Sequence, residues 1–493
     1  MDNIYVLNYL VNRNLGKSNG KLVASFVDLK AAFPSVNRGI LWRVVRERGI
    51  EDGLVERIKE LYEDTKERVK IGESLGREFW LGRGLRQGCP LSPILFNMLI
   101  ADLEERMSKR GKGGVILRNG RIYTLAYADD VVLMAENESG MKLLMKEFEK
   151  YVREKDLSVN VEKTKVVRFR KKNDKEKIEW RMNGKNVEEV NEFCYLGYWF
   201  MCNGRQDLNV AMRVEKGGKA MGQVWGIGKR RFQDDWKKRV WLFDALVWSI
   251  ISYGVEVWGW SEIGKLESMH EKFLRWTMGV SWNCPGYMVR EELGREKMVT
   301  KQRRRARNYE EKLEQGRGSK IAGMCWRLIK EGEGRCKRWE KERKKALREG
   351  GKSREKGKEI IEIWGKCDRE ERWKKVMESR YNRWYKMIKG EGLPKYLGRK
   401  MKYEKWSRVC RFRMGEGMRE CKYWMEEDER KCRICEYERK DWEHVLERCC
   451  SGRMEEGQSV TERVMWILDE NGQGERWMND LEEVRRKRKE GLI

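Results

Sequence analysis

The sequence contains little proline and little histidine, and it lacks a long apolar run. Five prolines and two histidines occur in 493 residues, and residues 95–284 contain no proline. Because proline ends or kinks a helix, this long middle segment can form extended helices. The most apolar window, residues 240–260, is interrupted by Asp244 and Glu256. Its apolar stretch is far shorter than the roughly 18 residues that a transmembrane helix needs, so no membrane span is expected.

Export signals and a disulfide framework are also missing. Residues 1–13 lack a basic region, and Asn3, Asn8 and Asn12 interrupt their apolar residues, which excludes a typical secretory signal. Thirteen cysteines, an odd number, are scattered along the chain. This usage indicates reduced thiols or metal ligands. We therefore expect an intracellular protein, nuclear or cytoplasmic, and not a secreted one.

Charge, by contrast, is abundant and unevenly distributed. The chain has 108 Lys and Arg against 80 Asp and Glu, a net charge of +28. Residues 301–400 alone contain 34 basic and 16 acidic residues, which gives +18. Such an excess favours a polyanionic partner, with nucleic acid ahead of an acidic membrane surface. The length suggests roughly two to four domains.

Strand and helix patterns alternate in the first 200 residues and predict an α+β fold, a mixed sheet covered by helices. The predicted strands are residues 21–29, two short strands within 123–135, 161–170 and 193–200. The predicted helices are a segment capped near Ser35 or Asn37 and ended by Gly49, and residues 51–65, 93–109 and 140–156.

Carboxylates lie at two strand ends, where a fold has no structural use for them. Asp28 ends the first predicted strand, and Asp129 and Asp130 join the two strands of 123–135. Neighbouring carboxylates in an apolar setting repel one another and are tolerated when a divalent cation neutralises them. Magnesium suits an all-oxygen site, and three such groups can hold two ions. The alternative is that Asp129 and Asp130 only form a hairpin turn.

Five short motifs follow one another in a fixed order. They are FVDLKAAF at 26–33, RQGCPLSP at 86–93, YADD at 127–130, NVEKTK at 160–165 and YLG at 195–197. Together they resemble the palm of a reverse transcriptase, most closely those of LINE-like retrotransposons, which lack long terminal repeats. The resemblance covers roughly residues 1–300. It implies a right-hand polymerase palm followed by a helical thumb.

The resemblance implies a role for each motif. Asp28, Asp129 and Asp130 would be the catalytic aspartates that bind magnesium or manganese. Phe33 would close the sugar pocket against a 2′-hydroxyl. The other implied roles are Gln87 and Gly88 beside nucleotide and template, Lys163 near the triphosphate, and Tyr195, Leu196 and Gly197 in support of the primer end.

Each of these roles has a simpler alternative. Phe33 could be ordinary core packing, and Gln87 and Gly88 could be turn residues only. Lys163 lies near Lys165, Arg168 and Arg170, a pattern more typical of a solvated face. Pro34 and Asn37 stand where such enzymes commonly carry acidic residues, and they are expected to affect helix capping more than chemistry.

The implied activity is RNA-directed DNA polymerisation, in which a dNTP gives its nucleotidyl group to a primer 3′-hydroxyl on an RNA template. DNA primer or target would be a further partner. Only 20 residues precede the first predicted strand, so the fingers are expected to be largely missing and the chain to be truncated there or decayed. The alternative function is therefore a non-catalytic nucleic-acid-binding derivative.

Downstream of a palm with partial fingers at 1–204, four further segments are predicted. They are a thumb-like helical region at 205–300, a basic helical region at 301–404, a zinc-knuckle-like module at 405–455 and a charged tail at 456–493. The basic region either binds template RNA or target DNA or consists of solvated helices, and its arginines at 303–307 could form a nuclear localisation signal. His270 is expected to be structural or exposed.

The module contains the spacing Cys432-x2-Cys435-x8-His444-x4-Cys449. Three thiolates and one imidazole are a good tetrahedral zinc set. The alternatives are free thiols beside a surface histidine, or Cys450 in place of Cys449. The segment has few apolar residues of its own, so zinc is expected to supply most of its folding free energy.

Overall fold

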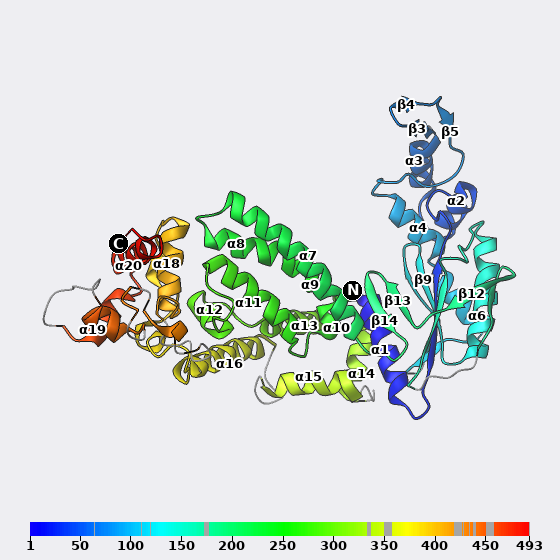
Figure 1. Ribbon diagram of the computed structural model, residues 1–493. Helices are drawn as coiled ribbons and strands as arrows, with labels where there is room; N and C mark the ends of the chain where they lie inside the picture. Colours follow the sequence, from blue (N-terminus) through cyan, green and yellow to red (C-terminus); the bar gives the residue numbers. More distant parts are fainter. Residues whose placement is uncertain are drawn as a thin grey trace. The chain divides into compact units, whose positions relative to one another are not determined.

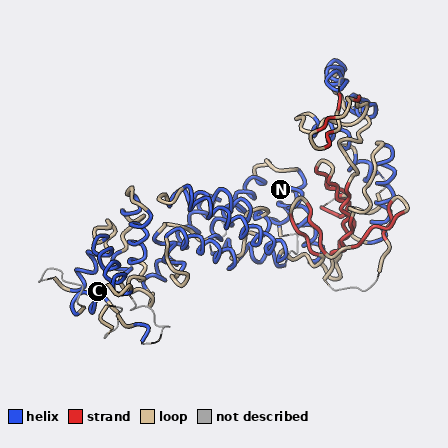
Figure 2. The backbone as a smooth tube through the Cα atoms, turned by 45° about the horizontal axis from the view of Figure 1, so that its top comes forward, coloured by secondary structure: helices blue, strands red, loops and turns tan. Residues whose placement is uncertain are grey.

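The computed structural model describes residues 1–63, 65–109, 111–118, 120–171, 177–332, 337–349, 357–418, 426, 428–432, 434–436, 440–449 and 458–492 (Figure 1). The chain forms two compact units. Unit 1 consists of Met1–Val210 and Glu310–Lys341, and unit 2 of Ala211–Tyr309 and Glu342–Ile493. Every strand among the described residues belongs to unit 1 (Figure 2). This division splits the predicted basic region, 301–404, between the units.

A mixed sheet forms the centre of unit 1, as predicted, and two of its six strands, β11 and β12, were not predicted. Its order is β11-β12-β10-β1-β9-β8, with β1 antiparallel to β9 and β10 and with β10 parallel to β12. The strands are β1 (Leu22–Asp28), β8 (Thr124–Tyr127), β9 (Asp130–Ala135), β10 (Lys165–Phe169), β11 (Trp180–Met182) and β12 (Lys185–Glu189).

Side chains along each strand point alternately to the two faces of the sheet. Helices cover one of these faces. Val23 and Val27 of β1 join a core with apolar residues of α3 (Asp52–Glu63) and of four further helices. These four helices are α2 (Arg38–Glu47), α4 (Ser92–Ile100), α5 (Leu103–Lys109) and α6 (Glu138–Glu154). The Asn37 side chain accepts a hydrogen bond from the Ile40 N–H and caps α2, which confirms its predicted capping role.

The other face carries helix α1 (Asp2–Gly16) and a hairpin of β13 (Glu192–Tyr195) and β14 (Tyr198–Met201). Phe26 of β1 stacks on Phe193 of the hairpin with ring centroids 4.3 Å apart. The single strand predicted over 193–200 was wrong, because the chain reverses at Leu196 and Gly197, whose φ angles are 47° and 74°.

The remaining elements of unit 1 are smaller. The helix predicted over 93–109 is two helices, α4 and α5, separated by a turn at Ala101 and Asp102. Helix α14 (Lys320–Glu331) contacts α1. The others are the short strands β2 (Lys66–Glu67), β3 (Lys70–Ile71), β4 (Ser74–Leu75), β5 (Phe79–Trp80), β6 (Val115–Leu117) and β7 (Gly120–Ile122).

Unit 2 is helical where the structure describes it. Its first elements are α7 (Asp207–Arg231), α8 (Trp236–Leu242), the π-helical turn η1 (Phe243–Val247), α9 (Trp248–Ile251), α10 (Val255–Trp258), α11 (Gly264–Met278), α12 (Gly286–Glu292) and α13 (Met298–Glu314). The later ones are α15 (Lys337–Glu349), α16 (Gly357–Met377), α17 (Tyr385–Ile388), η2 (Lys395–Gly398), α18 (Tyr403–Arg413), η3 (Asp428–Arg430), η4 (His444–Arg448), α19 (Val460–Ile467) and α20 (Glu475–Lys489). Helices α7, α13 and α15 each cross the boundary between the units.

A buried ion pair links several of these helices. The Arg413 guanidinium donates to the Glu292 carboxylate over 2.7 Å, and the hydroxyls of Tyr385 and Tyr396 donate to the same carboxylate, each over 2.8 Å. Both charged side chains are fully buried. Removing one partner of such a pair leaves an uncompensated buried charge, which is strongly destabilising.

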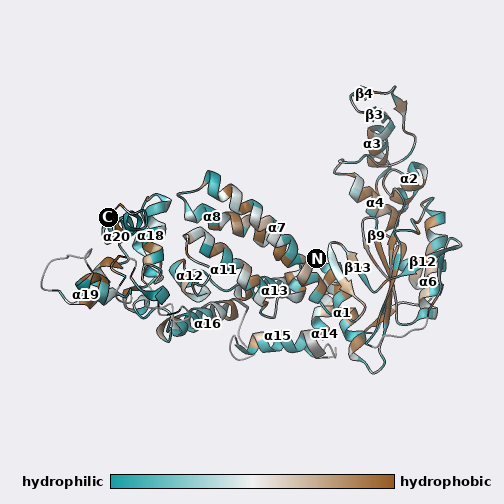
Figure 3. Cartoon of the chain, in the orientation of Figure 1, coloured by the Kyte–Doolittle hydropathy of each residue, from teal (hydrophilic) through white to brown (hydrophobic). Residues whose placement is uncertain are grey.

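Apolar and polar residues alternate along these helices (Figure 3), and none of the described helices is long and apolar enough to cross a membrane. His270 on α11 is fully buried, and its ring lies 5.4 Å from that of Phe243. It is therefore a core residue, in agreement with the structural role predicted for it.

Candidate functional site

The three aspartates lie at one end of the sheet of unit 1. Asp28 is the last residue of β1 and Asp130 the first of β9, and the two are paired in the antiparallel register. Asp129 lies in the turn between β8 and β9, where Ala128 has a φ of 52°. Partial burial, together with the negative charges of Asp129 and Asp28, raises the pKa of Asp130.

This donor set fits magnesium. All three side chains offer oxygen, the ligand atom that Mg²⁺ prefers. Because Asp28 and Asp129 disfavour the ionised form of Asp130, a divalent cation between them would relieve their repulsion. Among the described residues, however, the three aspartates do not form a group as tight as the one formed by Cys432, Cys435, His444 and Cys449.

A turn at residues 160–164 supports the backbone of Asp28. The Asn160 N–H donates to the Asp28 carbonyl over 2.8 Å, and the Asp28 N–H donates to the Thr164 hydroxyl over 3.3 Å. Lys163 is exposed on this turn. The structure thus brings the predicted lysine next to the Asp28 segment. The sequence analysis missed Asn160 and Thr164 as supports, although both lie inside the motif that it identified.

Phe33 and the Gln87-Gly88 turn belong to neighbouring segments. The Leu85 N–H donates to the Phe33 carbonyl over 2.8 Å. The Phe33 ring is half-buried and stacks on Phe96 at 5.0 Å. Gly88 has a φ of 83°, which glycine adopts without strain. Phe33 therefore packs on the core and still presents part of its ring, so its gating role stays a prediction.

A basic cavity of about 640 Å³ lies beside this turn. Gln87 is exposed and lines it. Four cationic residues also line the cavity, namely Arg38, Lys66, Arg83 and Arg86. This part of unit 1 can therefore attract a phosphate group next to the Phe33 segment.

The hairpin of β13 and β14 places Tyr195 close to the aspartates. Burial raises the pKa of the Tyr195 hydroxyl, and the charge of Asp130 raises it further. The Asn3 amide of α1 donates to the Ala126 carbonyl over 3.0 Å and to the Tyr195 hydroxyl over 3.4 Å. Asn3 therefore ties the hairpin to strand β8. The sequence analysis missed this link, for which the available signal was a polar residue in a mostly apolar helix.

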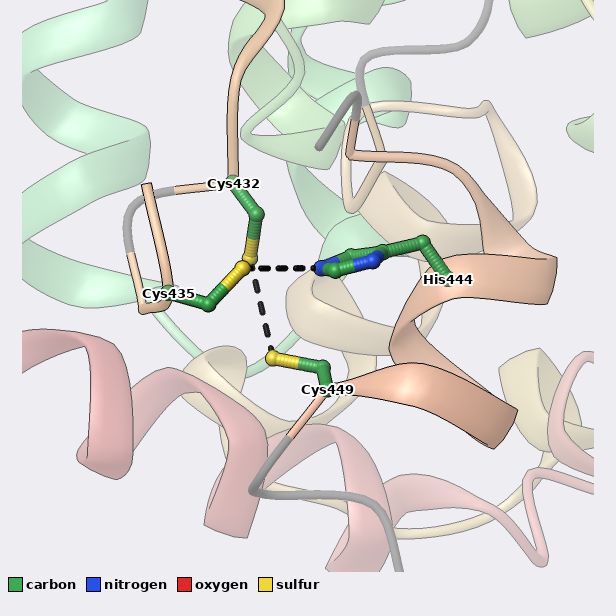
Figure 4. Close-up of side chains that lie close together, drawn as sticks. All are labelled: Cys432, Cys435, His444 and Cys449. Carbon is green, nitrogen blue, oxygen red and sulfur yellow. Dashed lines mark hydrogen bonds between the residues drawn. The ribbon is translucent and has the colours of Figure 1, made fainter. Parts of the chain in front are cut away.

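Unit 2 contains a second candidate site, formed by Cys432, Cys435, His444 and Cys449 (Figure 4). One ligand atom from each lies within 4.8 Å of the others. The Cys435 sulfur is 3.1 Å from His444 Nε2, and the Cys432 and Cys449 sulfurs are 3.8 Å apart. His444 is buried, so the alternative of a surface histidine was wrong. Cys450 lies outside the described residues.

The thiol of Cys432 is easily ionised. Burial alone would raise its pKa, but hydrogen bonds from the backbone of Ile434 and Cys435 and from the side chains of His444 and Cys449 bring it down to about 7. The Asp441 carboxylate accepts a hydrogen bond from the backbone N–H of His444 over 2.8 Å. This bond fixes the start of the turn that carries the imidazole. Three sulfurs and one ring nitrogen at these separations fit a tetrahedral zinc ion.

This cluster is embedded in the core of unit 2, which corrects the expectation that the segment has little apolar core of its own. Cys432, Trp442 and Cys449 belong to the same buried cluster as Trp406 of α18 and Leu481 of α20. The packing that supports the site therefore comes both from α18, most of which lies inside the predicted module, and from α20 outside it.

The arginine cluster at 303–307 is largely engaged within unit 2. Arg303 pairs with Glu349 at 2.8 Å, Arg304 with Glu296 at 2.9 Å, and Arg305 with Glu256 at 2.8 Å. These charges are compensated by carboxylates of the same unit, which favours the structural interpretation of this cluster.

Comparison with known proteins identifies the fold of unit 1. Residues 4–200 match the family described as "Reverse transcriptase (RNA-dependent DNA polymerase)". The chain is 25% identical over 209 residues to the "Retrovirus-related Pol polyprotein from type-1 retrotransposable element R2" of Popillia japonica, covering 41% of this chain and 34% of that protein. It is 27% identical over 211 residues to the corresponding type-2 R2DM polyprotein of Drosophila melanogaster, covering 41% and 20%.

Among solved structures, the telomerase of Candida tropicalis, in complex with a fragment of telomeric RNA, shows 14% identity and a TM-score of 0.32, covering 73% of this chain and 51% of that one. The chain spans a third or less of the length of the two R2 proteins. The family match and the R2 relatives agree with the motif order and the mixed sheet. Residues 4–200 are therefore a reverse transcriptase domain of the LINE-like kind, which lacks long terminal repeats.

Proposed function

We propose that this chain is an RNA-directed DNA polymerase of a retrotransposon. The observation that carries the proposal is the pairing of Asp28 with Asp130, and the adjacent Asp129, at one end of the sheet of a reverse transcriptase domain. Its substrates are dNTPs, an RNA template and a DNA primer or target. Because such reactions meet cellular nucleic acid and nucleotides, the proposed location is intracellular.

Each residue of the site has a proposed part in the reaction. Mg²⁺ or Mn²⁺ ions held by Asp28, Asp129 and Asp130 would activate the primer 3′-hydroxyl and neutralise the charge on the leaving pyrophosphate. Lys163, on its turn next to Asp28, attracts the triphosphate. Phe33 excludes a ribose 2′-hydroxyl, and the turn at Gln87 and Gly88 lets the backbone approach nucleotide and template. Tyr195, Leu196 and Gly197 support the primer end.

Primer extension on an RNA template tests this proposal. Asp129→Asn removes one anionic ligand at nearly constant volume, and metal ions typically supply several kcal/mol of transition-state stabilisation. Extension should therefore fall on the order of 100-fold or more. Asp52→Asn is the matched control, because Asp52 is exposed on α3. Equal extension by the Asp129 variant and wild type would refute the metal assignment.

The alternative function has its own signature in the same experiment. A non-catalytic derivative would bind primer–template with an affinity that depends steeply on salt, and wild type would extend no primer at any Mg²⁺ or Mn²⁺ concentration. Anisotropy with a labelled primer–template, measured without dNTPs, separates binding from extension. Binding without extension by wild type would favour this alternative.

We also propose that Cys432, Cys435, His444 and Cys449 hold one structural zinc ion. The donor set and its separations within 4.8 Å carry this assignment. Because the site lies in the core of unit 2, removing the ion should loosen that unit rather than one small segment. Structural zinc contributes on the order of 10 kcal/mol to the folding of small domains, and the core around this site reduces the share that depends on the metal.

The zinc assignment is tested on the full chain. Wild type and the control Cys367→Ser, which changes an exposed thiol elsewhere in unit 2, should each carry one zinc ion by elemental analysis. Cys435→Ser should lose the ion and lower the unfolding temperature. A full complement of zinc in the Cys435 variant would contradict the assignment.

A further inference from the structure

Trp282 is held in solvent by an ordered loop. It lies between α11 and α12, and 87% of its surface is exposed. The loop is fixed on both sides, because the Glu416 carboxylate accepts the Ser281 N–H over 2.5 Å and the Arg275 guanidinium donates to the Cys284 carbonyl over 2.7 Å. A large aromatic side chain fixed in water loses the hydrophobic gain of burial. Such a residue is typical of a binding surface.

Trp282 forms one wall of an open groove of about 740 Å³ in unit 2. This wall also contains Asn283, Pro285 and Tyr287 from the start of α12. The opposite wall is formed by the end of α16 and the residues that follow it. Its residues are Lys375, Glu378, Ser379, Arg380 and Tyr381. Helices α12 and α16 are in contact, so the two walls belong to one packed structure.

The groove combines aromatic and cationic groups. Residues 371–390 contain seven Lys or Arg and two acidic residues. Arg380 is exposed, and within the described ranges no acceptor is assigned to its guanidinium. Lys375 shares the Glu371 carboxylate with Lys297, at 2.7 and 3.0 Å. The charge of Glu378 is partly offset by Lys374, 3.9 Å away. The groove therefore has cationic groups available beside an exposed indole.

We propose that this groove binds single-stranded nucleic acid, with a base stacked on Trp282 and the backbone phosphates near Arg380 and Lys375. An aromatic platform beside cationic side chains is the arrangement by which proteins hold single strands without reading their sequence. A duplex does not offer the face of an interior base for such stacking. The inference rests on the proposed function, because it names a second place where that polymerase holds its nucleic acid.

The chemistry of the groove favours this occupant over a protein. Protein docking surfaces have a contiguous apolar centre from which charges are depleted. Around Trp282, charged and polar residues occupy most of the opposite wall. A strand of nucleic acid satisfies both the indole face and the cations, whereas an apolar protein patch would leave Arg380 and Lys375 desolvated.

The experiment uses the full chain and a labelled single-stranded 20-nucleotide RNA, without dNTPs, and measures affinity by anisotropy at several salt concentrations. Stacking of one base contributes about 1–3 kcal/mol, so Trp282→Ala should weaken binding roughly 5- to 100-fold. Trp282→Phe should retain most of the affinity. Arg380→Gln should reduce the slope of log K against log salt by about 0.7, the value expected for one phosphate contact on a single strand.

Trp241→Ala is the matched control, since Trp241 is also exposed, at 63%, but lies on α8 outside the groove. Its affinity should equal that of wild type, and none of the variants should change binding to a blunt duplex. Equal RNA affinities for the Trp282→Ala and Trp241→Ala variants would overturn the proposal. A change in oligomeric state by Trp282→Ala with unchanged RNA affinity would also overturn it and would point to a protein partner.

The outcome is separable from that of the polymerase proposal. The binding assay needs neither turnover nor the aspartates, so Asp129→Asn should bind the RNA as wild type does. Loss of extension in that variant with loss of binding in Trp282→Ala would support both proposals. A wild-type chain that extends no primer but loses RNA affinity through Trp282→Ala would refute only the catalytic one.

Discussion

Two buried ionisable groups one turn apart on α11 predict a specific dependence of stability on pH. Glu267 and His270 are both buried. Burial raises the pKa of Glu267 to about 7, although the hydrogen bond that its carboxylate accepts from the Val299 N–H acts to lower it. Burial also lowers the pKa of His270 well below its usual value, and the positive charges of Arg295, Lys301 and Arg290 lower it further.

The two shifts act in opposite directions. Below about pH 6.5, the unfolded state binds a proton on His270 that the folded state does not, so this residue makes stability fall as the pH falls. Between about pH 4.5 and 7, the folded state keeps a proton on Glu267 that the unfolded state releases, so this residue makes stability fall as the pH rises. Each effect is worth about 1.4 kcal/mol per pH unit. In wild type the two effects oppose each other below about pH 6.5.

Single substitutions separate the two effects. Glu267→Gln keeps an oxygen that accepts the Val299 N–H, and relative to wild type this variant should gain about 3 kcal/mol as the pH rises from 4.5 to 7. His270→Phe keeps an aromatic ring against Phe243, and relative to wild type it should gain stability as the pH falls below about 6.5, because it has no imidazole to protonate in the unfolded state.

Urea unfolding at half-unit pH steps measures both differences, and subtracting wild type removes the titration of all other groups. A pH-independent difference for either variant would refute the corresponding buried, shifted group. The double variant should show neither difference on its own, because it lacks both groups, whose effects oppose each other in wild type.

Two further substitutions test the roles proposed in unit 1. Phe33→Ala should lower the preference for dNTPs over rNTPs, measured as the ratio of kcat/KM values, because the ring no longer meets the 2′-hydroxyl; an unchanged ratio would assign Phe33 to core packing alone. Asn3→Ala removes two hydrogen bonds, each typically worth about 0.5–1.5 kcal/mol, and should lower kcat for primer extension roughly tenfold while KM for dNTP stays constant; an unchanged kcat would show that the link to Tyr195 has no positioning role.

The sequence predicted the site better than the path of the chain around it. The order of the five motifs and the strand-end position of Asp28 placed the aspartates together before any coordinates. Helical periodicity over 93–109 did not reveal the break at Asp102, whose carboxylate accepts hydrogen bonds from Tyr151 and Lys155 at 2.8 and 2.9 Å. These partners come from α6, so the break depends on contacts that local sequence does not contain.

The turn at Leu196 and Gly197 shows the same limit. A two-residue hairpin with positive φ at both positions normally contains Asn-Gly or Asp-Gly. Leucine gives no such signal, and its conformation is held by the packing of Phe26 on Phe193 and Tyr195. The clustering of Cys432, Cys435, His444 and Cys449, in contrast, was predicted from their spacing, because metal-ligand patterns are local in sequence even where their supporting core is not.

The contact of α14 with α1 constrains the order in which unit 1 can fold during synthesis. Helix α1 is synthesised about 300 residues before its partner α14, in which Trp326 and Ile329 are buried. The Asp2 carboxylate accepts the Ser319 N–H, and Arg118 pairs with Glu331 at 2.8 Å. Unit 1 is therefore closed only after residues 211–309 of unit 2 have been synthesised. During translation, the apolar surface of α1 that α14 covers in the folded protein is therefore exposed until α14 has been made. Chaperones bind exposed apolar surface of this kind.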